Sequence, residues 1–188
     1  MEMQNGYSIV SQTISDIIRL LDYNFRRLTM NINYNPIGYV HSPIKNVEGS
    51  PIQSVGADNI TGFIELDHSL IDGLKDLDGF SHIIVLYHFH KSKDSELICK
   101  PFLDDKKHGI FAIRGPNRPN AIGFSVVSIL KIEDNIIHIG NVDILDGTPV
   151  LDIKPYVHEF DSLTNTRSGW LEKKAKGSKT IRSDDRFL

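Results

Sequence analysis

From Pro36 onward the chain consists of short apolar segments separated by glycine, proline, asparagine and aspartate, and this pattern strongly constrains the fold. We expect strands over residues 37–41, 62–66, 82–90, 111–114, 125–133 and 136–143. Asp134-Asn135 should close the last two as a hairpin, and Asp67 can cap a short helix over residues 68–77. Strands and helices do not alternate, so the sequence predicts a mainly β, antiparallel fold that is closed or partly closed as a barrel, with short helices.

A different periodicity precedes this region. Residues 11–28 carry apolar side chains at separations of three, four and seven, which predicts an N-terminal amphipathic helix. Residues 31–35 form a polar break after it. We therefore divide the chain into a helical extension (1–33), a β-barrel domain (34–165) and a basic C-terminal tail (166–188).

Composition limits the kind of protein this can be. A chain of 188 residues with 40% hydrophobic content can bury one well-formed core. The apolar runs are too short for a membrane span and the polar start is no secretory signal, so we expect a soluble, cytoplasmic protein. A single cysteine, Cys99, excludes an intrachain disulfide and a Cys-rich zinc site.

Charge is unevenly distributed along the chain. The net charge of −3 gives no global attraction to nucleic acid, but residues 167–188 hold seven Lys or Arg against three Asp or Glu. This tail can meet phosphates, or it can be a solvated end of the chain. Residues 91–108 are also rich in charge, and we interpret them as a long mobile loop.

Two motifs stand out. Residues 114–125 read Arg-Gly-Pro-Asn-Arg-Pro-Asn-Ala-Ile-Gly-Phe-Ser, and two prolines make this a stiff loop that presents guanidinium and amide groups to an anionic or multi-hydroxyl ligand. Residues 143–156 read Asp-Ile-Leu-Asp-Gly-Thr-Pro-Val-Leu-Asp-Ile-Lys-Pro-Tyr, in which Asp146-Gly147 is a strong turn signal. Neither a Gly-x-Gly-x-x-Gly motif nor a Gly-Lys-Ser/Thr phosphate loop occurs in the chain.

Together with Gly-Tyr-Val-His-Ser-Pro at 38–43 and Gly-Phe-Ser-His at 79–82, these motifs closely resemble the signatures of the TsaA-like (VirR or YaeB) family. Its typified members are S-adenosylmethionine-dependent tRNA (adenine-37-N6)-methyltransferases. The resemblance runs from Ile37 to about Ser162, although Gly115, Asn117 and Ala121 replace the family's usual serine, aromatic residue and proline. It implies a small barrel, S-adenosylmethionine as cofactor, tRNA as substrate, and a homodimer with its pocket near the subunit boundary. The N-terminal helix should then pack within or across that dimer rather than contact RNA.

The resemblance also implies which residues bind ligands. Cofactor contacts fall on five segments: Ile52, Gln53 and Ser54; His90 and Lys91; Arg114; Phe124; and Leu145, Asp146, Gly147 and Thr148. Arg114 suits a carboxylate, and Asp146 can accept from a hydroxyl or ammonium group. Motif positions that either bind substrate or brace loops are Arg118, Asn120, Asp152, Lys154 and Tyr156. No catalytic residue is assigned, because in-line methyl transfer depends mainly on positioning.

Two alternatives remain open at this stage. Histidines 82, 88 and 90 are separated by even numbers of residues and would share one face of a strand, so they could bind zinc with Asp143 or Asp146. Pocket lining explains them more simply, and we expect no metal. The chain could also be a non-catalytic nucleotide- or RNA-binding module with the same fold.

Overall fold

The computed structural model describes residue 19 and residues 31–187, which fall into two compact units, residues 1–34 and 35–188. The helix predicted over residues 11–28 lies outside the described residues, apart from Arg19. The proposed domain boundaries stay a prediction. In the described part of the chain, no helix is both long enough and apolar enough to cross a membrane.

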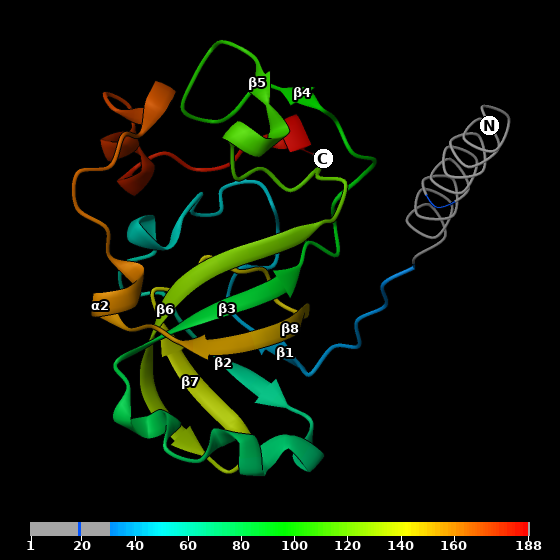
Figure 1. The fold of residues 1–188 in the computed structure, drawn as a ribbon, viewed down its shortest axis with the longest axis vertical. Coiled ribbons are helices and arrows are strands. Elements are labelled where there is room, and N and C mark those ends of the chain that lie inside the picture. Colours follow the sequence, from blue (N-terminus) through cyan, green and yellow to red (C-terminus); the bar gives the residue numbers. More distant parts are fainter. Residues whose placement is uncertain (1–18, 20–30, 188) are drawn as a thin grey trace, which may run out of the picture. The chain divides into compact units, whose positions relative to one another are not determined.

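The second unit contains a closed antiparallel barrel (Figure 1), which confirms the predicted mainly β barrel. Its strands are β1 (Gly38–His41), β2 (Thr61–Leu66), β3 (His82–His88), β6 (Ile122–Glu133), β7 (Ile136–Gly140) and β8 (Thr148–Pro155). They pair in the order β1-β2-β7-β6-β3-β8, and β8 pairs with β1 to close the barrel. A separate two-stranded sheet joins β4 (Ile98–Cys99) and β5 (His108–Gly109).

Helices in this unit are short and mostly 3-10. They are η1 (Ser54–Gly56), η2 (His68–Leu74), η3 (Leu77–Gly79), η4 (Ile110–Ala112), α2 (His158–Asp161), η5 (Gly169–Leu171), η6 (Ala175–Lys179) and η7 (Asp185–Phe187). The cap predicted at Asp67 is present, because its Oδ1 accepts from the Ser69 amide at 2.8 Å. The helix that follows is a 3-10 helix ending at Leu74, and a second begins at Leu77.

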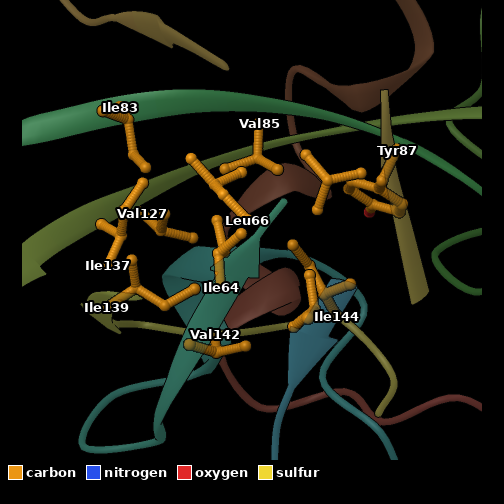
Figure 2. Close-up of a cluster of buried hydrophobic side chains, with 12 residues drawn as sticks. Ile64, Leu66, Ile83, Val85, Tyr87, Val127, Ile137, Ile139, Val142 and Ile144 are labelled. Carbon is orange, nitrogen blue, oxygen red and sulfur yellow. The ribbon is translucent and has the colours of Figure 1, made fainter. Parts of the chain in front are cut away.

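The core fills the barrel interior. Along β3, Ile83, Val85 and Tyr87 are buried while His82 and His88 are exposed, as the period of two in a strand requires. Figure 2 shows these side chains meeting residues from β2, β6 and β7, including Ile64, Val127 and Ile137. Burying such an aliphatic side chain contributes about 1.5–3 kcal/mol, so the barrel is a rigid platform for the loops at its ends.

Three predictions about local structure were wrong. Residues 111–114 are not a strand, because η4 occupies Ile110–Ala112. The loop predicted over residues 114–125 ends earlier, since β6 begins at Ile122. The predicted strands omitted residues 148–155, which form β8; its prolines lie near its ends, where a missing amide donor costs little.

The charged segment 91–108, interpreted as one long loop, contains β4 and leads into β5. Its Cys99 is buried with Ile110, Ile113 and Phe187 in a second apolar cluster, against which Phe102 and Trp170 pack. The cluster forms because β4 and β5 bring chain segments together that a local sequence pattern does not connect.

The C-terminal tail is part of this second cluster. The Trp170 indole Nε1 donates to the carbonyl oxygen of Ala112 at 2.8 Å, and Lys174 Nζ lies 2.6 Å from Asp104 Oδ1. The Gly49 amide donates to the carbonyl oxygen of Ser183 at 2.8 Å, which ties the tail to the segment after β1. A solvated chain end therefore does not describe residues 169–187, and the tail supports the arginine-rich loop from one side.

Candidate functional site

Arg114 brings together three of the segments predicted to bind a cofactor. Its Nη1 donates to Gln53 Oε1 at 2.9 Å, and its Cζ lies 5.6 Å from the centroid of the Phe124 ring. Gln53 directly precedes η1 and Phe124 lies in β6, so the contact joins residues far apart in the sequence. Arg114 is exposed, and its remaining N–H groups can reach a ligand carboxylate.

The Asp146-Gly147 turn directly precedes β8 and lies beside β1, because the Gly147 amide donates to the carbonyl oxygen of Val40 at 2.8 Å. Asp146 Oδ1 accepts from the Ser42 amide at 3.0 Å, and Oδ2 lies 2.8 Å from Lys45 Nζ. The Lys45 and Ser42 hydrogen bonds lower the pKa of Asp146. Gly147 has a φ of +72°, a left-handed conformation that favours glycine. Asp146 is thus a partnered carboxylate that shapes the turn, and less free to accept from a ligand than its sequence position suggests.

The other predicted cofactor residues lie at the same end of the barrel. Thr148 Oγ1 and His90 Nδ1 are 3.3 Å apart, and the end of β3 pairs with the start of β6 through His88 and Ile122. Burial, followed by Lys91 and His88, lowers the pKa of His90, which favours a neutral imidazole. Of the other predicted residues, Ile52 accepts a hydrogen bond at its carbonyl oxygen from Gln53 Nε2, Lys91 is exposed, and Leu145 is half-buried.

Asp143, the first residue of the second motif, is a further polar residue of this region, predicted only as an alternative metal ligand. Its Oδ1 is shielded from solvent and has no hydrogen-bond partner among residue 19 and residues 31–187. Burial raises the pKa of Asp143 to about 6, while hydrogen bonding to Ser125 and to the Ser54 amide and the charge of Arg114 oppose the rise. Ser54, also predicted to bind cofactor, therefore lies beside this carboxylate.

Ser125 and Tyr87 extend this polar group into the barrel. The Tyr87 hydroxyl lies 3.2 Å from Ser125 Oγ, and burial together with the nearby Asp143 raises the pKa of Tyr87. Tyr87, Ser125 and Asp143 thus form a buried polar group next to Arg114. The only sequence signal for it was that Asp143 begins the second motif.

The substrate-binding candidates do not share one location. Arg118 Nη1 donates to the carbonyl oxygens of Ile110 and Ile113 at 3.1 and 2.9 Å, so this arginine braces η4. Asn120 is exposed in the same loop. Lys154 and Tyr156 lie near the other end of β3, because Lys154 pairs with Ile84 and the Tyr156 amide donates to His82. Lys154 Nζ lies 2.6 Å from Asp152 Oδ2. Substrate contacts at these positions stay a prediction.

The alternative zinc site lacks the expected geometry. His82 and His88 point outward from β3, but the strand ends at His88 and His90 turns toward Thr148. Across residue 19 and residues 31–187, no group of three or more His, Cys, Asp or Glu side chains lies close enough to hold a metal ion.

Comparison with known proteins places this architecture in a family. Residues 39–162 match the model of the tRNA-methyltransferase O N-terminal domain. The chain belongs to this family. The match covers the barrel and both motifs, and it confirms the TsaA-like resemblance drawn from the sequence.

Relatives within the family show how much of each protein the chain represents. The chain is 50% identical over 161 residues to a probable S-adenosyl-L-methionine-binding protein of Pyrococcus abyssi, covering 86% of this chain and 88% of the relative. It is 36% identical over 146 residues to the human tRNA (adenine(37)-N6)-methyltransferase, covering 73% of this chain and 33% of that enzyme. The crystal structure of TrmO from Pseudomonas aeruginosa is similar with a TM-score of 0.64 and 34% identity, over 75% of this chain and 63% of that one. The chain thus spans about a third of the human enzyme it matches.

Proposed function

We propose that this chain is an S-adenosylmethionine-dependent tRNA methyltransferase that methylates N6 of the adenosine at position 37, with or without a threonylcarbamoyl group, next to the anticodon. The observation that carries the proposal is the contact of Arg114 with Gln53 and Phe124, which joins three segments that the family motifs assign to the cofactor. Membership of the methyltransferase family and the names of the relatives support it. We further propose a cytoplasmic location.

The residues present fit the proposed cofactor. An exposed guanidinium with free N–H groups suits the carboxylate of the methionine moiety, and the turn at Gly147 offers backbone groups for polar edges. When bound, S-adenosylmethionine supplies a methyl group already activated by the sulfonium charge. The chain's own contribution is then to orient two reactants, and good alignment can supply about 7–11 kcal/mol of the barrier.

We also propose that the protein forms a homodimer. Ile122 and Phe124 are 41% and 44% exposed at the start of β6. Phe111, in η4 before the loop that leads to β6, is 78% exposed. A soluble protein tends to cover adjacent apolar side chains of this size, so we propose that a second copy covers them beside the cofactor site. Light scattering at micromolar concentration should give the mass of a dimer, and a monomeric mass would contradict this part of the proposal.

Methyl incorporation into tRNA tests the function itself. The protein is incubated with radiolabelled S-adenosylmethionine and tRNA that carries threonylcarbamoyladenosine at position 37, and a tRNA with guanosine at that position is the control. Label in the first RNA alone supports the proposal. Cofactor binding without transfer to any tRNA would favour the alternative, a non-catalytic nucleotide- or RNA-binding module.

Replacing Arg114 by alanine is expected to weaken S-adenosylmethionine binding about ten- to a hundredfold, because a charge-assisted hydrogen bond contributes about 1.5–3 kcal/mol. Arg114 is exposed, so the fold should persist, as unfolding midpoints will show. Arg167→Ala, an exposed arginine of the tail, is the matched control and should bind normally. Equal affinity of folded Arg114→Ala and unaltered protein in calorimetry would remove Arg114 from the cofactor site.

Charge in the tail should contribute to tRNA affinity. Lys173, Lys176 and Lys179 are exposed, whereas Lys174 pairs with Asp104. Changing the three exposed lysines to glutamine should lower the slope of log affinity against log salt by about 2, since each phosphate contact contributes about 0.7–0.9. Truncation is a poorer test, because it removes the buried Phe187 and the packed Trp170. An unchanged slope in filter binding would mean that the tail does not meet the RNA.

A further inference from the structure

A row of ring side chains crosses the outer face of the barrel. His41 of β1 pairs with Phe63 of β2, Phe63 pairs with His138 of β7, and His138 pairs with Lys131 of β6. These residues alternate with core residues such as Val40 and Ile64, so they project away from the core. The His41 and Phe63 rings are stacked, with centroids 4.5 Å apart at 14°, and His138 lies 6.0 Å from Phe63 at 45°.

The row lies in a groove of about 690 Å³, a size that accommodates a small organic ligand. Its lining includes the three rings, Lys45, Lys131 and Asp146. The His41 and His138 side chains remain 39% and 30% exposed. A cross-strand pair alone would account for the stacking of two rings, but not for an open groove with three partly exposed rings in register across neighbouring strands.

Charge in and around the groove favours stacking over phosphate binding. Lys45 pairs with Asp146 at 2.8 Å, and Lys131 pairs with Glu133 at 2.8 Å. Glu133 also lies 3.2 Å from His138, and Glu65 lies 3.0 Å from His41. These carboxylates offset the positive charges and hold the two imidazoles. With the charged groups paired, the groove offers a ligand mainly the faces of its rings. Ring faces bind unpaired nucleobases with little dependence on base identity.

We propose that this groove binds an unpaired nucleobase of the RNA substrate, stacked against the row formed by His41, Phe63 and His138. The inference rests on the proposed tRNA substrate. The groove continues to Asp146, which belongs to the turn assigned to the cofactor, so a base in the groove lies beside the candidate site. Single-stranded RNA loops are recognised in this way, because their bases are free to leave their neighbours and stack on aromatic side chains.

Fluorescence titration with an anticodon stem-loop RNA tests the proposal, using loops in which single positions carry the fluorescent base 2-aminopurine. Phe63→Leu keeps an apolar side chain but removes the ring, and it should lower RNA affinity about five- to a hundredfold, as loss of one base–aromatic stack does. At least one loop position should be quenched on binding to the unaltered protein and not on binding to this variant. Phe63→Tyr should retain both properties. Phe160→Leu removes an exposed ring in α2 that does not line the groove, and it is the matched control.

Four outcomes decide the matter. Reduced RNA affinity and lost quenching in Phe63→Leu, with unchanged S-adenosylmethionine affinity and unfolding midpoint, establish the stacking site. Unchanged RNA affinity and quenching in folded Phe63→Leu would overturn the site and leave the proposed methyltransferase intact. If Phe63→Leu turns dimers into monomers, the groove is a contact between copies of the chain, and this result would also overturn the stacking site. If the unaltered protein neither binds the RNA nor methylates tRNA, the proposed function and this inference both fall.

Discussion

Gly123→Ala is expected to lower the free energy of unfolding by about 3 kcal/mol, the upper range for overpacking a core. A methyl group at Gly123 would overlap the Tyr87 ring, which lies directly over this glycine. Tyr87 is only 6% exposed and its ring meets Phe89 edge-on at 5.3 Å, so it has little room to move. Denaturant unfolding measures the change, because the midpoint should fall while the slope stays the same.

Gly73→Ala is the matched control for this experiment. An added methyl group there meets no atom of the described part of the chain within 4 Å, so its effect should stay within about 1 kcal/mol. Gly123→Ala should also weaken cofactor binding, since displacing Tyr87 disturbs its contact with Ser125 below Arg114. A Gly123→Ala protein as stable as the unaltered one would show that β3 and β6 can separate without cost, contrary to the packing seen here.

Asp143→Asn is expected to stabilise the protein by up to about 3 kcal/mol at pH 7.5 and by little at pH 3. The pKa of Asp143 rises from 3.8 to about 6 because the carboxyl is buried. Well below pH 3.8 the group is protonated in both the folded and the unfolded chain, and it carries no penalty. Between pH 4 and 6 the unfolded chain ionises first, so stability falls by about 1.4 kcal/mol per pH unit, and above pH 6 the loss is constant. Asparagine does not titrate, which removes this loss.

The comparison is made as a difference between two unfolding curves at each pH, since the lowered pKa values of Asp104 and Asp146 act in the opposite direction in both proteins. Ser125→Ala provides a second variant: it removes a hydroxyl that opposes the rise, so the pKa of Asp143 should increase further. Parallel curves for Asp143→Asn and the unaltered protein would mean that the Asp143 carboxyl ionises as freely in the fold as in the unfolded chain.

Patterns that are local in the sequence predicted much of the barrel. The strand predicted over residues 82–90 forms as β3 over His82–His88, and its alternation buries Ile83, Val85 and Tyr87. The hairpin at Asp134-Asn135 formed as expected, with Asp134 at a φ of 54°, because short polar side chains tolerate this conformation. The two motifs were sufficient to recognise the family, and the family model spans both. These predictions are confirmed because each depends on sequence patterns that extend over only a few neighbouring residues.

Tertiary structure decided the rest. Arg114 and Arg118 lie in the same sequence motif, but their contacts differ. Arg114 is exposed and donates to Gln53, whereas Arg118 Nη1 donates to carbonyl oxygens around η4. The Asp143 carboxyl is shielded from solvent because the fold brings it beside Ser125 of β6, Ser54 of η1 and Arg114. The row of His41, Phe63 and His138 depends on the register of β1, β2 and β7, which is set when the barrel closes and not by any single stretch of the chain.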